Sequence, residues 1–169
     1  MKIASLVASA LAMTVTVTAP PASALPAAGK PAPAFSAKLL DGSNFDLAGK
    51  RGHVVIVSFW ATWCGPCRQE MPALQAYYKR HHGEGLDMVA VSMDDPGKDK
   101  AVRKVMAAYS FPAAMKQQAK TDGYGMVYRL PMAFIIDRNG VLRFDGTNDA
   151  QVFDAKKLDA VVTPLLAGR

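Results

Sequence analysis

The sequence predicts one α/β domain, in which a central mixed β-sheet is flanked by helices and carries an extra β-hairpin at its N-terminal end. Two unbroken apolar runs, at residues 53–60 and 88–93, are typical of buried central strands. Each run is followed by a stretch with helical character, the order expected of strands joined by crossover helices. Asn139-Gly140, between two later strand-like runs, indicates an antiparallel hairpin. From this order we expect helices on both faces of the sheet.

The first half of the domain should hold a hairpin, a strand and a helix. Residues 35–40 and 45–47 are strand-like, and Asp41-Gly42 between them is a hairpin-turn dipeptide. After the buried strand at residues 53–60, a helix should run over about residues 66–80. Pro66 suits the first turn of that helix, where its missing N–H costs nothing.

The second half continues the alternation of strands and helices. Residues 99–109 place apolar side chains at helical spacing after the strand at residues 88–93. Residues 132–137 and 141–145 form the two strands of the Asn139-Gly140 hairpin. The last helix gathers its apolar residues on one face, and Pro164 should break its final turn.

The N-terminus has the features of a secretory signal peptide. Lys2 supplies a positive charge, the stretch from there to Met13 is apolar and uncharged, and Ala22-Ser23-Ala24 is a small-residue cleavage site. An uncleaved membrane anchor is the less favoured interpretation, because the apolar stretch is short for a membrane span. The Pro- and Ala-rich segment that follows is typical of a flexible linker. We therefore expect a signal peptide at residues 1–24, a linker at 25–34 and the folded domain at 35–169.

The formal charge of +6 comes from basic residues that are scattered along the chain. Such scatter is typical of a solvated surface and lacks the basic, aromatic-interleaved face of a nucleic-acid-binding protein. Export places the cysteines in an oxidising compartment, but two closely spaced cysteines do not make a disulfide-stapled scaffold. We expect a monomer with no bound cofactor and no nucleic-acid partner.

Both cysteines lie in the motif Trp63-Cys64-Gly65-Pro66-Cys67, where an apolar strand runs into a helix. The start of a helix favours a thiolate, because unpaired backbone N–H groups and the macrodipole stabilise negative charge. A thiol with a pKa of about 8.5 is roughly 3% ionised at pH 7, whereas one with a pKa near 7 is roughly half ionised. Cys64 is therefore the expected accessible nucleophile, and Cys67, one turn further, is the expected resolving thiol.

Other uses of the cysteine pair compete with redox chemistry. A purely structural disulfide that closes so short a loop would contribute only about 2 kcal/mol. A structural zinc site needs four ligands, and the chain has no second cysteine pair. Two thiolates suit Cu(I), so a Cu(I)-binding metallochaperone remains an alternative function.

With this motif and this order of elements, the chain resembles the thioredoxin superfamily, and within it the exported TlpA-like and ResA-like thiol–disulfide oxidoreductases. The resemblance covers about residues 33–167, and two segments carry it: FWATWCGPCRQEMP at residues 59–72 and LPMAFIID at residues 130–137. It implies a thioredoxin-like fold, with the family's insertion between a strand and a helix near residues 113–128.

The resemblance also implies roles for residues around the dithiol. Pro131 matches the cis-proline that faces the cysteines and helps to dock the substrate backbone. Leu130, just before it, would shape access to Cys64, and Trp63 would pack beside the disulfide. The residues that we assign to substrate binding on this basis are Trp63, Gly65, Pro66 and Leu130.

Glu70 matches an acidic residue that lies near the cysteines in ResA-like proteins. If it is partly buried, its raised pKa would let it exchange a proton with Cys67. An equally good interpretation is that an acid in the first turns only favours the helix dipole. Thioredoxin's buried strand acid, six residues before the first cysteine, is replaced here by Ser58, so proton transfer to Cys67 must use Glu70, water or the substrate.

These implications together predict an exported, periplasmic disulfide reductase. The Gly65-Pro66 dipeptide is that of thioredoxin, which is strongly reducing at about −270 mV. The resemblance implies a membrane electron donor of the DsbD or CcdA type. As acceptor it implies oxidised apocytochrome c, in cytochrome c maturation, or a metalloprotein assembly factor. A peroxiredoxin-like peroxidase is a further alternative, although an adjacent dithiol that opens a helix fits it less well.

Overall fold

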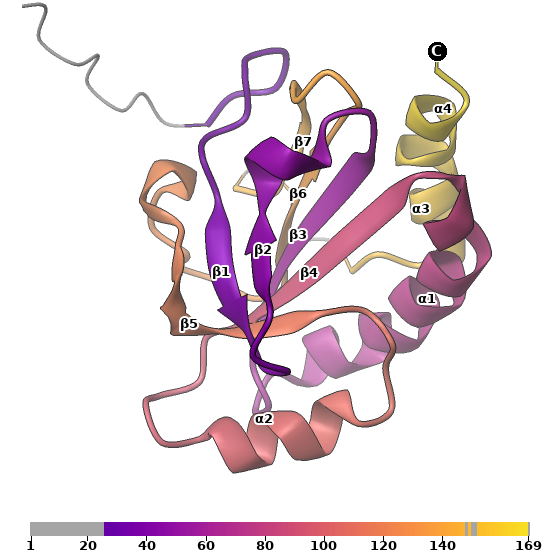
Figure 1. Ribbon diagram of the computed structural model, residues 1–169. Coiled ribbons are helices and arrows are strands. Elements are labelled where there is room, and N and C mark those ends of the chain that lie inside the picture. The colour runs from indigo at the N-terminus through magenta and orange to yellow at the C-terminus, as the bar shows by residue number, and fades with distance from the viewer. Residues whose placement is uncertain (1–25, 148, 150–151, 169) are drawn as a thin grey trace, which may run out of the picture.

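A computed structural model describes residues 26–147, 149 and 152–168 (Figure 1), so the expected signal peptide at residues 1–24 lies outside the described residues. The strands are β1 (Ser36–Leu39), β2 (Asn44–Asp46), β3 (Val54–Trp60), β4 (Leu86–Ser92), β5 (Ala113–Lys120), β6 (Met132–Ile136) and β7 (Leu142–Asp145). The helices are α1 (Gly65–His81), α2 (Asp99–Met106), α3 (Ala155–Val161) and α4 (Thr163–Leu166). Short 3₁₀ turns are η1 (Leu47–Lys50), η2 (His82–Glu84) and η3 (Asp122–Tyr124). The seven strands form one sheet in the order β2-β1-β5-β4-β3-β6-β7.

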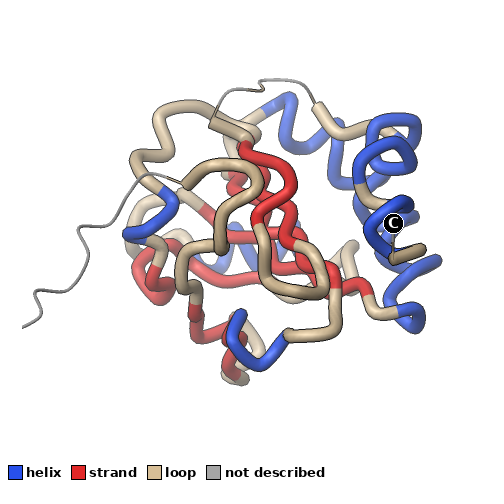
Figure 2. Tube along the Cα trace, turned by 90° about the horizontal axis from the view of Figure 1, so that it is seen from above, coloured by secondary structure: helices blue, strands red, loops and turns tan. Residues whose placement is uncertain are grey.

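The sheet is mixed, as expected, and its parallel part decides where the helices lie. β3, β4 and β5 are parallel neighbours, whereas β6 and β7 extend the sheet antiparallel to β3. Right-handed crossovers between successive parallel strands that advance in one direction place their helices on the same face. One buried cluster accordingly holds apolar side chains of α1, α2 and α3 against the sheet, among them Leu74, Val102 and Leu158. In Figure 2 the C-terminal end of the chain lies among helices on one side of the strands.

The expectation of helices on both faces is therefore wrong, because the opposite face is covered by the N-terminal hairpin and η3. Strand alternation directs Val57 and Phe59 to this face and Ile56 to the helical one. The rings of Phe35 and Phe45 lie 5.8 Å apart here, and Tyr124 of η3 packs 4.9 Å from Phe134. The predicted hairpin, β1 and β2, thus forms one edge of the sheet, and its buried side chains also fill the core on this face.

β5 is the element that the sequence analysis missed. It lies within residues 113–128, which we interpreted as a family insertion, and it pairs with both β1 and β4. Only its first three residues are fully buried, and the remainder, Lys116–Lys120, is largely polar. A strand without a continuous apolar run or regular alternation gives no clear signal in the sequence.

Part of the expected linker packs against the domain. Gly29 N donates a hydrogen bond to Leu142 O at 2.7 Å, and Ala32 N donates one to Gly140 O at 2.9 Å. Residues 29–32 therefore run beside the start of β7, and the folded region begins before residue 35.

At the other end of the chain, Pro164 lies in the first turn of α4 and separates it from α3, in agreement with the expected break. No helix within the described ranges is long and apolar enough to cross a membrane.

Candidate active site around the Cys64–Cys67 disulfide

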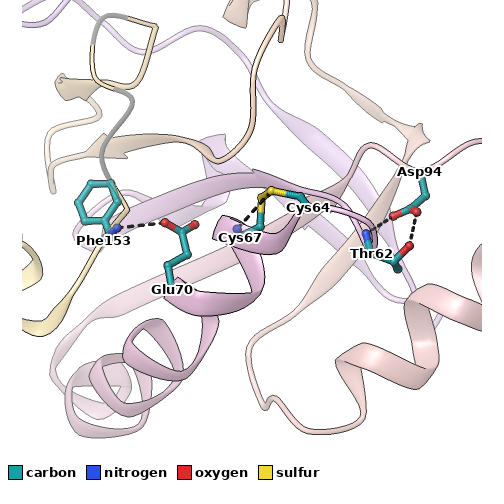
Figure 3. The surroundings of a disulfide bond; sticks show 6 residues. All are labelled: Thr62, Cys64, Cys67, Glu70, Asp94 and Phe153. Atoms are coloured by element: carbon teal, nitrogen blue, oxygen red, sulfur yellow. Dashed lines mark hydrogen bonds between the residues drawn. A yellow bond between two sulfur atoms is a disulfide. The ribbon is translucent and has the colours of Figure 1, made fainter.

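Cys64 and Cys67 form a disulfide at the start of α1 (Figure 3). β3, buried along its whole length, leads into this point, and Cys64 is the N-cap residue of the helix. Its Sγ accepts a hydrogen bond from Cys67 N at 3.2 Å, and Pro66 lies in the first turn. Cys64 is 4% exposed and Cys67 is fully buried. The nucleophile is thus far less accessible in the disulfide form than the sequence analysis expected, although it remains the more exposed of the two.

A buried carboxylate, Asp94, fixes the segment that leads to Cys64. Thr62 N donates to Asp94 Oδ2 at 2.9 Å, and Thr62 Oγ1 donates to Oδ1 at 2.5 Å. Ser92 Oγ donates to Oδ2 at 2.7 Å. Burial acts to raise the pKa of Asp94, but these hydrogen bonds outweigh it and lower the pKa below its usual value. The ionised carboxylate therefore ties the turn before Cys64 to the end of β4 (Figure 3).

Asp94 was not among the site residues predicted from the sequence. One signal was present, because Asp94 directly follows the apolar run of β4, and the carboxyl ends of the parallel strands β3 and β4 meet at one edge of the sheet. An acid at that position is therefore brought next to the segment that leaves β3.

The Leu130–Pro131 peptide bond is cis, the isomer that the resemblance implies. Pro131 directly precedes β6, which pairs antiparallel with β3 in a register that places Met132 opposite Phe59. The next position along this ladder sets Pro131 across from Trp60, the last residue of β3. The cis-proline thus lies at the edge of the sheet from which the chain continues to Cys64.

A hollow of about 380 Å³ lies beside the cis-proline, and we call it the apolar groove. Its lining residues are Trp63, Met93, Val127, Tyr128, Arg129 and Leu130. Trp63 is 70% exposed, so its side chain forms an open wall of this groove. In the described part of the chain the exposed large apolar side chains are Trp63, Met126 and Tyr128; Trp63 and Tyr128 line the groove, and Met126 directly precedes its lining residue Val127.

The loop that carries the groove is anchored to the turn after β7. Arg129 donates from Nη2 to Gly146 O at 2.8 Å and to Thr147 O at 2.7 Å, and Tyr128 donates its hydroxyl to Thr147 O at 2.6 Å. Of the groove residues, sequence reasoning found Trp63 and Leu130 and missed Met93 and residues 127–129. No local pattern marks these residues, because the fold brings them together from separate loops.

Glu70 is buried one turn after Cys67, with 1% of its surface exposed. In Figure 3 it extends from α1 between the disulfide and Phe153, whose backbone N–H donates to Glu70 Oε2 at 3.0 Å. Loss of solvent raises the pKa of Glu70 to about 7, against the hydrogen bond from Phe153 and the positive charge of Lys157, which lower it. Lys157 Nζ in turn donates to Asp149 at 2.8 Å and lies 4.7 Å from the centre of the Phe153 ring. Glu70 is thus buried with a raised pKa, which is the condition under which we expected it to exchange a proton with Cys67.

This arrangement suits a two-electron exchange between the Cys64–Cys67 pair and a disulfide on another polypeptide. The less buried cysteine, Cys64, is the better placed to exchange with an external sulfur, while the fully buried Cys67 closes the internal disulfide. A group that titrates near neutral pH lies on the same helix as the buried cysteine.

Comparison with known proteins places the chain in a family. The thioredoxin-like protein YneN of Bacillus subtilis is 37% identical over 118 residues, which are 68% of each chain. The thiol-disulfide oxidoreductase ResA of Bacillus anthracis is 35% identical over 114 residues, which span 66% of this chain and 65% of ResA. A crystal structure of a putative thiol:disulfide interchange protein DsbE from Chlorobium tepidum superposes with a TM-score of 0.69 at 31% identity, covering 83% of this chain and 99% of that one. Residues 28–145, which hold the dithiol and every strand from β1 to β7, match the AhpC/TSA family, and the chain belongs to that family as a thioredoxin-like member.

Proposed function

We propose that this protein is an exported thiol–disulfide oxidoreductase that works in cells as a disulfide reductase. The observation that carries the proposal is the paired placement of the two cysteines: Cys64, the less buried of the two at 4% exposed, is the N-cap residue of α1, and Cys67 is fully buried one turn inside. The names of the ResA and DsbE relatives support the same activity. The Gly65-Pro66 dipeptide favours the reducing direction.

In the reducing direction the Cys64 thiolate attacks one sulfur of the substrate disulfide. That bond breaks, the other substrate sulfur leaves as a thiolate, and a mixed disulfide joins Cys64 to the substrate. Cys67 then loses its proton and attacks Cys64 Sγ, which releases the second substrate thiol and forms the Cys64–Cys67 disulfide. The dithiol thus gives up two electrons for each substrate disulfide reduced.

Glu70 is the group that we assign to proton transfer at Cys67. A carboxyl with a pKa of about 7 is half ionised at neutral pH, so it can accept the Cys67 proton and return it when the pair is reduced again. Ser58, buried in β3 where thioredoxin has an acid, has no such capacity near neutral pH.

The partners follow from the compartment. A reductase in an oxidising compartment has to be re-reduced, and we assign this step to a membrane dithiol donor of the DsbD or CcdA type. Oxidised apocytochrome c, or a metalloprotein assembly factor, is the proposed acceptor. The signal-peptide pattern at residues 1–24 supports export, and the proposed location is the periplasm.

The alternative function as a Cu(I)-binding metallochaperone is supported by fewer observations. Across the described ranges no group of three or more His, Cys, Asp or Glu side chains is placed to hold a metal. A Cu(I) ion bound by Cys64 and Cys67 would therefore find no third ligand of these types among the described residues. Titration of the reduced protein with Cu(I) distinguishes the two functions.

The redox state of the pair in cells tests the proposed direction. Acid quenching followed by thiol labelling should find Cys64 and Cys67 mainly as thiols in unperturbed cells. Deletion of the membrane donor should convert most of the pair to the disulfide, because re-reduction is lost while substrates continue to oxidise it. A pair that stays oxidised in both strains contradicts the reductase assignment.

A further inference from the structure

A second hollow, of about 520 Å³, also borders the dithiol segment. It lies between the start of α1 and α2, and its lining residues are Thr62, Arg68, Ala101, Lys104, Val105, Ala108 and Tyr109. It shares no lining residue with the apolar groove. Because Thr62 and Arg68 line this hollow and Trp63 lines the groove, the Cys64–Cys67 segment borders both.

The charged side chains that line this second hollow are both positive. Arg68 and Lys104 are exposed, and no ion pair joins either of them to an acid in the described part of the chain. Besides Lys104, α2 carries two more basic residues, Lys100 and Arg103, and a single acid, Asp99. Asp94, the carboxylate that accepts hydrogen bonds from Thr62 at the edge of this hollow, is buried and also accepts one from Ser92. We call this second hollow the basic hollow.

We propose that the preferred substrates are protein disulfides whose reacting cysteine is flanked by an apolar residue on one side and acidic residues on the other. This inference rests on the proposed function and names the substrate class of the same site. The apolar residue enters the groove formed by Trp63, Tyr128 and Leu130, and the acidic residues lie over Arg68 and Lys104. The exchange of sulfurs is the one described above, and the basic hollow takes no part in bond making.

The physical basis is complementarity of charge and of apolar surface at one site. Burial of an apolar side chain against exposed Trp63 and Tyr128 removes apolar area from water. Carboxylates near two unpaired cations speed the encounter and fix the direction in which the segment crosses Cys64, and this contribution is screened by salt. A basic segment in the same place meets like charge.

Single-turnover reduction of model peptides tests the proposal. The protein is reduced with dithiothreitol, freed of it, and mixed with peptides whose one cysteine carries 2-mercaptoethanol as a mixed disulfide. All peptides carry an apolar residue on one side of the cysteine. The two positions on the other side are both Asp, both Asn or both Lys. Each peptide is also made in the reverse order, with the apolar residue and the two variable positions exchanged across the cysteine. In the better direction the Asp peptide should react about five- to tenfold faster than the Lys peptide at low ionic strength, and this ratio should fall towards one in about 1 M salt.

Variants assign the preference to the basic hollow. Lys104→Glu should reduce the Asp-to-Lys rate ratio to one or below, and Lys104→Gln should give an intermediate ratio. Lys79→Glu is the matched control, because Lys79 is exposed at the far end of α1 and lines neither hollow, so this variant should keep the wild-type ratio. Comparing two peptides within one variant cancels any change in the reactivity of the dithiol itself.

An Asp-to-Lys ratio near one in the wild type, or one that Lys104→Glu leaves unchanged, overturns the proposal while the reductase function stands. Failure to reduce even the Asn peptide overturns the proposed function as well. Lys104 is on the solvent face of α2, whereas Val102 and Met106 hold the helix to the core, so the substitution spares the packing.

Discussion

Replacing Cys64 with serine should lower the reduction of protein disulfides to the level of a buffer control, and replacing Cys67 with serine should leave a single reaction without turnover. Cys64 is the less buried of the two cysteines and the assigned nucleophile, and a serine hydroxyl does not ionise near neutral pH, so no attack on the substrate takes place. In the Cys67→Ser variant the first attack proceeds, but no second sulfur is present to release the substrate. Each molecule of this variant should therefore end as one long-lived mixed disulfide.

Mass spectrometry of the products measures this prediction. The expected species for Cys67→Ser is a covalent adduct of one substrate per protein, sensitive to dithiothreitol, and Cys64→Ser should give none. Alkylation of the reduced wild-type protein at graded pH provides the check on the order of the two thiols. Preferential labelling of Cys67 near neutral pH, or an adduct on Cys67 in the Cys64→Ser variant at the same rate, would reverse the assignment.

Replacing Glu70 with glutamine should slow the resolving step by about 100-fold and remove its pH dependence around pH 7. In the wild type the ionised carboxylate accepts the Cys67 proton, so the rate should rise with pH through about 7, the pKa to which burial raises this group. Glutamine has a similar volume and keeps an oxygen for the hydrogen bond from Phe153 N, but it cannot take up a proton. Stopped-flow or quenched measurement of the decay of the mixed disulfide over pH 5–9 tests this. Glu84→Gln, at an exposed glutamate, is the control and should keep the wild-type profile.

The same substitution should change how stability depends on pH. The pKa of Glu70 is higher in the folded protein than the ordinary value of 4.5, so the folded state holds the proton more tightly than the unfolded state. This contribution to stability is complete below about pH 4.5 and is lost as the pH rises through about 7. Between pH 5 and 8 the wild type should therefore lose up to about 3 kcal/mol of unfolding free energy relative to Glu70→Gln. Parallel denaturation curves that show no such difference would mean that Glu70 is solvated, and its role in proton transfer would fall.

Local signals in the sequence predicted most of the sheet. β3 and β4 are unbroken apolar runs, and the turn dipeptides Asp41-Gly42 and Asn139-Gly140 marked both hairpins. β5 escaped because its second half is polar, and its place in the sheet depends on pairing with β1, a strand more than 70 residues earlier. The side on which α2 packs follows from the direction of the β4-to-β5 crossover, so missing β5 also led to the wrong expectation about the two faces.

The residues of the candidate site could likewise be predicted only in part from local sequence signals. The cysteines, Pro131 and Leu130 were found because they lie in two short motifs that resemble a family. The burial of Glu70 was not decidable from its own helix, since the residue that contacts it, Phe153, is 83 positions further along the chain. Asp94 and the groove residues Met93 and Tyr128 likewise reach the dithiol only through the fold.

The reduction potential of the Cys64–Cys67 couple tests the reductase assignment most directly. The protein is equilibrated with dithiothreitol or glutathione buffers of graded potential, and the fraction of disulfide is measured by thiol labelling after acid quenching. We predict a potential nearer to that of thioredoxin, about −270 mV, than to that of DsbA, about −120 mV. The gap of about 150 mV corresponds to about 7 kcal/mol for a two-electron couple, so the two outcomes are well separated. A value near −120 mV would make the protein an oxidant and would contradict its function as a disulfide reductase.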